Sequence, residues 1–139
     1  MDAIREAIAA NQADAATYSA GVRIWMGVMT VAFLSSAIFA LKKPDARWFL
    51  LAMLSNIASL VLVRAACPEL SRTMIGTVAH LVFWLPILVI VWRPSARAAR
   101  REANASLFNT VFTVWLVAAS TIMATSLVLD ARTALSWLI

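Results

Sequence analysis

His80 is the only histidine of the chain, and it lies in the long apolar stretch "TVAHLVFWLPILVIVW". An ionisable side chain inside a membrane helix is costly unless a partner meets it, so such a residue indicates a functional site by default. On a helix, Thr77 precedes His80 by one turn and Trp84 follows it by one turn, while Pro86 cannot donate a helical hydrogen bond. We therefore expect Thr77, His80 and Trp84 to line one stripe beside a kink.

Other apolar stretches carry the polar residues that could meet His80. Asn56 is central enough in its stretch to need a hydrogen-bond partner, and its amide could bond His80 or a threonine of the last stretch. These residues predict either an interhelical polar cluster that fixes packing or a site for a small ligand. The residues of this cluster are His80, Trp84, Thr77, Asn56, Ser59 and Thr113.

The residue inventory excludes several kinds of chemistry. One histidine cannot supply two axial ligands to a haem, and His80 with the single cysteine, Cys67, is too small a set for zinc. The expected spans contain no Asp or Glu, so no Ser-His-Asp triad is expected and His80 should meet only carbonyls and neutral side chains. We expect no metal, no cofactor and no catalytic residue set.

The composition predicts an integral membrane protein. Of the 139 residues 63% are hydrophobic, and the mean hydropathy is +0.84. A spanning helix needs about 20 apolar residues, and lipid requires every backbone group to bond internally. The sequence therefore predicts one all-α domain over residues 1–139, an antiparallel four-helix bundle with short N-terminal and C-terminal interfacial segments. The expected spans are 24–41, 48–66, 74–92 and 107–129.

Two basic turns separate these spans, and they share the pattern basic-Pro-x-Ala-Arg at 43–47 and 93–97. Because basic loops stay in the cytoplasm, we expect loops 42–47 and 93–106 to be cytoplasmic in a bacterial-type inner membrane, with both termini outside. Basic residues that flank spans suit anionic lipid head groups better than nucleic acid. The residues expected to contact head groups are Lys42, Lys43, Arg47, Arg93, Arg97, Arg100 and Arg101.

The second basic turn is followed by a longer polar stretch than the first. Residues 96–129 contain neither proline nor glycine, so they predict one continuous helix. Its first part, 96–106, should extend into the cytoplasm as a basic surface for lipid or a partner.

Tryptophans and small residues add two expectations about packing. Trp25, Trp48, Trp92 and Trp137 fall at span ends, where indole N–H groups usually reach into the head groups as an interfacial belt. Small residues, including Gly27 and Gly76, should let helices approach closely within the bundle or between subunits.

Three functions fit these features. The first is association, as an accessory subunit of a membrane complex or as a homo-oligomer. The second is binding or transport of a small hydrophobic or amphiphilic molecule, quinone-like or lipid-like, at His80. The third is a membrane enzyme with His80 as a general base. The expected partners are membrane lipids, a protein or second copy, and such a ligand, but not nucleic acid.

Overall fold

The protein is built of helices. The computed structural model describes residues 1–102 and 106–139, with the side chains of 1–100 and 106–139. No strand occurs in these ranges, so the predicted all-α class is confirmed. In chain order the elements are α1 (Asp2–Ala16), α2 (Ala20–Leu34), α3 (Ser36–Ala40), α4 (Pro44–Ala66), α5 (Arg72–Ala79), the π-helical turn η1 (His80–Trp84), α6 (Leu85–Trp92), α7 (Pro94–Glu102) and α8 (Leu107–Ser136).

Four helical segments of the described chain are long and apolar enough to cross a membrane. With a rise of about 1.5 Å per residue, each covers the hydrocarbon core of roughly 30 Å. The chain is therefore an integral membrane protein. The segments are Ala20–Ala40, formed by α2 and α3; Pro44–Ala66, which is α4; Arg72–Trp92, formed by α5, η1 and α6; and Leu107–Ser136, which is α8.

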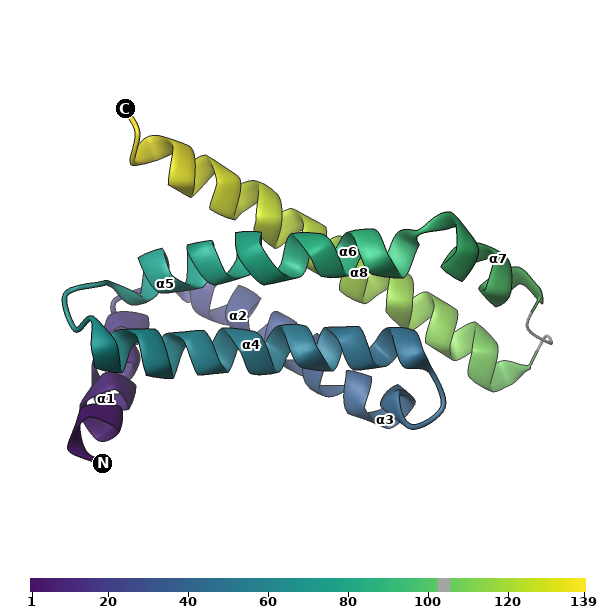
Figure 1. Cartoon of the computed structure of the whole chain (residues 1–139), viewed down its shortest axis with the longest axis horizontal. Helices are drawn as coiled ribbons and strands as arrows, with labels where there is room; N and C mark the ends of the chain where they lie inside the picture. The colour runs from purple at the N-terminus through teal and green to yellow at the C-terminus, as the bar shows by residue number, and fades with distance from the viewer. Residues whose placement is uncertain (103–105) are drawn as a thin grey trace.

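The four spans alternate in direction. Figure 1 shows both chain termini, α1 and the α4–α5 connection at one end of the bundle, which we call the terminal side. The α3–α4 turn and α7 lie at the opposite end, the loop side. Both predicted basic turns thus share one end, while the assignment of that end to the cytoplasm stays a prediction.

Aromatic rings fill the core where the spans cross. Trp84 is 2% exposed, and its ring lies edge-on to Phe33 with 5.0 Å between centroids. Phe49 contacts Trp115 in the same way at 5.3 Å. These pairs join α2 to η1 and α4 to α8, so the core links all four spans.

Indole N–H groups bond between spans rather than to solvent. Trp25 donates to the Ser126 hydroxyl at 3.2 Å and Trp92 to the Ser120 hydroxyl at 2.8 Å. The expectation that these two indoles reach into the head groups is wrong, because α8 presents a serine to each. In lipid, a donor without a water partner is satisfied by a neighbouring helix.

The first span is broken at Ser35. The Trp115 indole donates to the Ala32 carbonyl at 3.1 Å and to the Ser35 hydroxyl at 2.8 Å. Because a side-chain donor from α8 occupies a carbonyl that the helix would use itself, α2 ends at Leu34 and α3 begins at Ser36.

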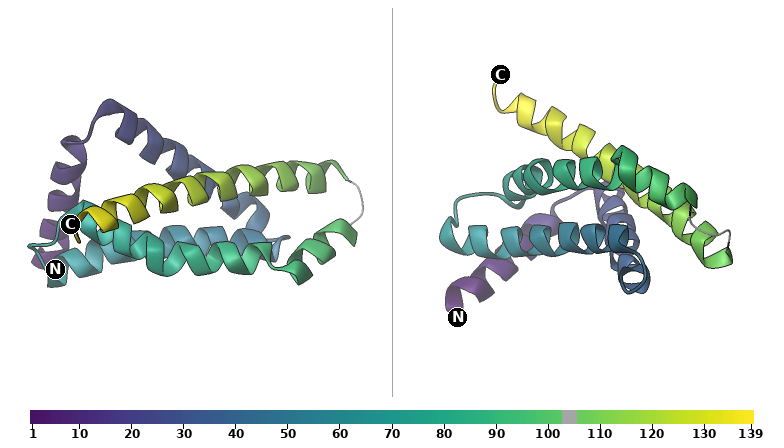
Figure 2. Two further views of the ribbon diagram at one scale, coloured as in Figure 1. Left: turned by 90° about the horizontal axis from the view of Figure 1, so that it is seen from above. Right: turned by 45° about the vertical axis from the view of Figure 1, so that its right-hand side comes forward.

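The last span extends beyond its expected end. We placed the end at Leu129 because hydropathy falls there, but α8 continues to Ser136. Hydropathy reports the preference for lipid, whereas Asp130 and Arg132 are compatible with a helix and do not stop it. Asp130 is therefore held on a rigid element, and α8 crosses the third span at an angle (Figure 2).

The continuous helix expected over 96–129 is wrong. α7 ends at Glu102, and Ser106 has the extended φ and ψ of −135° and 155° while its side chain accepts from the Asn109 N–H as an N-cap. Residues 103–105 of the expected extension lie outside the described residues. Arg100 holds α7 against the bundle by donating to Asp45 at 2.6 Å and to the Val91 carbonyl at 2.9 Å.

The expectation that Gly27 and Gly76 allow close helix approach is wrong within the bundle, and their contact between subunits stays a prediction. A Cβ added at Gly27 or Gly76 would meet no atom within 4 Å. Neither glycine therefore serves a close approach of helices within this chain. Ala79 and Ala119 are buried instead and supply the small contacts.

Candidate functional site

His80 has an acidic partner. Its Nδ1 lies 2.7 Å from Oδ2 of Asp130, and the Thr77 hydroxyl donates to Oδ1 of the same carboxylate at 3.1 Å. The expectation that His80 has only neutral partners is wrong. The helix α8 continues beyond Leu129, the expected end of the span, and so places Asp130 beside His80. An ionised carboxylate only accepts hydrogen bonds, so Nδ1 carries a proton.

The π-helical turn places His80. It spans His80–Trp84 and ends just before Pro86, which has no N–H to return to the preceding turn. Such turns widen a helix locally and frequently occur at functional sites. A kink was expected near Pro86, and the structure has a π turn there that contains His80 itself.

Trp84 holds the imidazole ring. The two rings stack with centroids 3.6 Å apart and an interplanar angle of 25°. The Trp84 indole donates to the Ala52 carbonyl of α4 at 3.1 Å. Because Trp84 is fixed by this bond and by burial, the His80 ring is held between it and Asp130. The structure thus brings Thr77, His80 and Trp84 together.

Two polar atoms at this level have no partner. His80 Nε2 and Asn56 Oδ1 are both buried without a hydrogen bond among the described atoms. The Trp84–Ala52 bond fixes the antiparallel register of η1 and α4. One turn from Trp84 and Ala52 toward the terminal side, η1 carries His80 and α4 carries Asn56. A buried polar atom without a partner costs about 1–3 kcal/mol, and Asn11 Oδ1 of α1 is a third such atom among the described residues.

Two predicted residues do not join this cluster. Thr113 is exposed, and its hydroxyl donates to the Asn109 carbonyl of its own helix at 2.8 Å. It lies toward the loop-side start of α8, more than four turns before Asp130. Ser59 is half-buried on α4, three residues past Asn56, and makes no hydrogen bond with the described residues.

The site lies nearer to the terminal side than to the loop side. His80 is the ninth residue of the span Arg72–Trp92, which puts it about 12 Å along the helix from Arg72. The side chains of His80 and Asp130 are 12% and 17% exposed, respectively. The pair is thus within the membrane span yet not fully enclosed.

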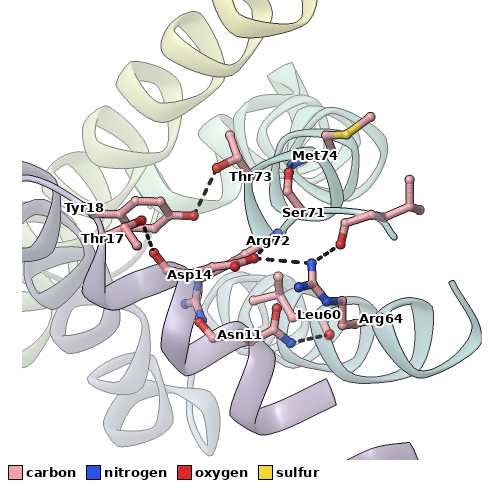
Figure 3. Close-up of polar contacts among 11 residues, drawn as sticks. Asn11, Asp14, Thr17, Tyr18, Leu60, Arg64, Ser71, Arg72, Thr73 and Met74 are labelled. Carbon is pink, nitrogen blue, oxygen red and sulfur yellow. Dashed lines mark hydrogen bonds and ion pairs between the residues drawn. The ribbon is translucent and has the colours of Figure 1, made fainter. Parts of the chain in front are cut away.

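A second polar cluster closes the terminal side (Figure 3). Asp14 of α1 accepts from Arg64 at 3.2 Å and from the Arg72 backbone N–H at 2.9 Å. Asn11 donates to the Leu60 carbonyl at 2.7 Å, and the Tyr18 and Thr73 hydroxyls share a bond of 3.0 Å. We call these residues the Asp14 cluster. They fasten α1, expected only to rest at the interface, onto α4 and α5.

Several basic residues of the loop side have partners inside the protein. Lys43 donates to the Asn109 side chain at 2.6 Å, Arg47 donates to the Ala40 carbonyl at 2.8 Å, and Arg100 bonds Asp45. These bonds fasten the turns, and the contact of these three residues with lipid head groups stays a prediction. Lys42, Arg93 and Arg97 are exposed, and the side chain of Arg101 lies outside the described residues.

Asp130 is the site residue that the sequence analysis missed. It directly follows Leu129, the last apolar residue of the expected span. The signal was the sequence after it, "ARTALSWL", which contains good helix formers and no Pro or Gly. A helix prolonged through this stretch would have placed an acid within reach of the other spans.

Fold and site together define a four-span helical membrane protein with a histidine–carboxylate pair inside the bundle. Comparison of the chain with models of protein families, with characterised proteins and with solved structures finds no match to any of them.

Proposed function

We propose that the protein binds a small amphiphilic molecule at the His80–Asp130 pair. The observation that carries the proposal is the imidazole with one nitrogen fixed on Asp130 and the other, Nε2, buried without a partner. Because the His80 ring is held in place and its Nε2 has no partner within the protein, Nε2 is available for a hydrogen bond with a ligand.

The position of the pair favours a ligand that enters from the lipid. His80 lies about 12 Å along the span from Arg72, inside the apolar part of a span of roughly 30 Å, so a molecule that reaches it must carry an apolar part. α8 crosses the third span instead of running along it (Figures 1 and 2), and Asp130 keeps 17% of its side chain exposed. A molecule with a polar head and an apolar tail fits both conditions.

The single histidine makes this proposal directly testable. Protein without a polyhistidine tag, labelled with ¹⁵N-histidine and held in lipid nanodiscs, gives one pair of imidazole nitrogen signals. Addition of a lipid extract from the host membrane is expected to move the Nε2 signal more than the Nδ1 signal, because Nδ1 is already bonded. An Nε2 signal that no lipid extract moves would contradict ligand binding at this place.

We propose self-association as a second function, favoured by a groove on the outer face of α6 and α8. The groove is lined by Leu88, Val89, Trp92, Val117, Ser120, Thr121 and Ala124. The small side chains at Thr121 and Ala124 would let a helix of a second copy approach closely. Native mass spectrometry is expected to show a dimer that Ala124→Trp abolishes and that Val31→Trp, at an exposed position of α2, leaves intact.

A further inference from the structure

We propose that the head group recognised at His80 and Asp130 is a protonated amine, carried by a hydrophobic molecule. This inference rests on the proposed ligand-binding function and adds the chemistry of the ligand to it. Two properties of the site carry the inference: its free polar atoms accept hydrogen bonds, and its carboxylate has no permanent cation.

The free atoms at the site are acceptors. In the proposed amine-bound state His80 is neutral with its proton on Nδ1, so Nε2 offers a lone pair, and Asn56 Oδ1 of α4 also only accepts. The carboxylate of Asp130 takes one bond from His80 and one from Thr77, which leaves lone pairs on both of its oxygens. A ligand that bonds these acceptors brings N–H or O–H groups, and a protonated primary amine brings three N–H groups.

The charge of the site favours an amine over a hydroxyl. Among the described residues, no lysine or arginine nitrogen lies within ion-pair distance of Asp130, whose only ionisable contact is His80. A neutral imidazole bonds the carboxylate without cancelling its charge. An uncompensated charge inside a membrane is costly, and a cationic head group removes that cost where an alcohol does not.

The other carboxylates bonded between helices of this chain have arginine partners. Asp14 is 3.2 Å from Arg64, and Asp45 is 2.6 Å from Arg100. Asp130 has no arginine partner, unlike Asp14 and Asp45. It lies in the apolar part of the protein, where a charge without a counter-ion costs more free energy. A cation supplied by a ligand accounts for the difference.

Protonation of His80 should compete with the amine. An imidazolium balances the charge of Asp130, and its Nε2–H donates instead of accepting, so amine binding releases one proton from the protonated pair. Asp130 of α8 is the titratable group in contact with His80, and α4 offers the neutral Asn56 at this level. Arg64 and Arg72 are bonded in the Asp14 cluster.

Three probes with one tail separate charge from hydrogen bonding. Dodecylammonium has charge and N–H donors, dodecyltrimethylammonium has charge without donors, and dodecanol has a donor without charge. Each is titrated into untagged, ¹⁵N-histidine-labelled protein in zwitterionic nanodiscs, with affinity expressed per mole of lipid. Dodecylammonium is expected to move the Nε2 signal at a concentration at least about tenfold lower than either of the other two.

The ranking of the wild-type protein alone decides the inference. Equal affinity for dodecanol and dodecylammonium would overturn the cationic head group while leaving ligand binding intact. Equal affinity for the trimethyl probe would overturn recognition by N–H bonds. If none of the three moves the signal and lipid extracts do not move it either, the proposed function itself fails.

Matched carboxylate variants provide the second measurement. Asp130→Asn is expected to lower the affinity for dodecylammonium by at least about tenfold, and Asp14→Asn is expected to change it by less than about twofold. An unchanged affinity in Asp130→Asn would overturn the inference. Because the probe ranking uses the unaltered protein, a variant that fails to fold does not remove the test.

Discussion

Asp14 and Asp130 are carboxylates in the same half of the bundle, yet their surroundings differ. Asp14 meets a guanidinium and a backbone N–H, and its cluster fastens α1 to α4 and α5 (Figure 3). Asp130 meets a hydroxyl and an imidazole whose second nitrogen has no partner. Asp14 is paired with an arginine, which stays charged, and this pair links two helices. Asp130 is paired with an imidazole, which can gain or lose a proton.

The largest expected effect comes from removing the Trp84 ring, which stacks on His80 of the His80–Asp130 pair. Trp84→Ala deletes a side chain that is 2% exposed, together with its stacking on His80 and its bond to Ala52. We expect a loss of about 3–5 kcal/mol in the free energy of unfolding, measured by titration with SDS in mixed micelles. Trp137→Ala is the control because Trp137 is 44% exposed; equal losses in both variants would contradict the central role of Trp84.

The same Asp→Asn change is expected to separate the two clusters. Asp14→Asn should cost about 1–3 kcal/mol, because the amide oxygen can still accept from Arg64 and the Arg72 N–H, but the negative charge that pairs with Arg64 is lost. Asp130→Asn should cost less than about 1 kcal/mol. Its amide oxygen can accept from Thr77 while its amide nitrogen donates to His80, which moves its own proton to Nε2.

Two measurements check this pair of variants. SDS titration gives the two free energies of unfolding, and ¹⁵N-histidine NMR of Asp130→Asn should report the tautomer with the proton on Nε2. Comparable destabilisation by the two variants, or an unchanged tautomer in Asp130→Asn, would remove the distinction between the clusters.

Replacement of Thr77 tests how much the hydrogen bonds of Asp130 contribute to the free energy of unfolding. Thr77 is 3% exposed and donates one of the two bonds that Asp130 accepts. Thr77→Val keeps the shape of the side chain and removes this bond, so we expect a loss of about 1 kcal/mol. The exposed Thr113→Val is the control, with a change below about 0.5 kcal/mol; a larger effect at position 113 would argue against this assignment.

Gly76 lies on α5 between the two clusters and gives the smallest effect. An added Cβ there meets nothing within 4 Å, so Gly76→Ala should leave both clusters intact. Since glycine in a helix is less stable than alanine by roughly 0.5–1 kcal/mol, we expect a gain of about that size. Destabilisation, seen in the same SDS titration, would mean that α5 must bend at this position.

The sequence predicted the spans well and the site only in part. The expected segments 48–66 and 74–92 correspond closely to Pro44–Ala66 and Arg72–Trp92. The stripe of Thr77, His80 and Trp84 was predictable because helical spacing alone creates it. Thr113 was misplaced because helical spacing does not say which residues of different spans share a level. The single helix over 96–129 was wrong because Ser106 caps a new one.

What the sequence determined by itself is that this chain has four apolar segments able to cross a membrane. That property depends on the length and composition of each apolar run, which are local. Only the tertiary structure decided that His80 faces Asp130, a residue 50 positions away. The contact depends on α8 continuing past its apolar part and on the level at which two helices cross, and both are set by packing between spans rather than by either stretch alone.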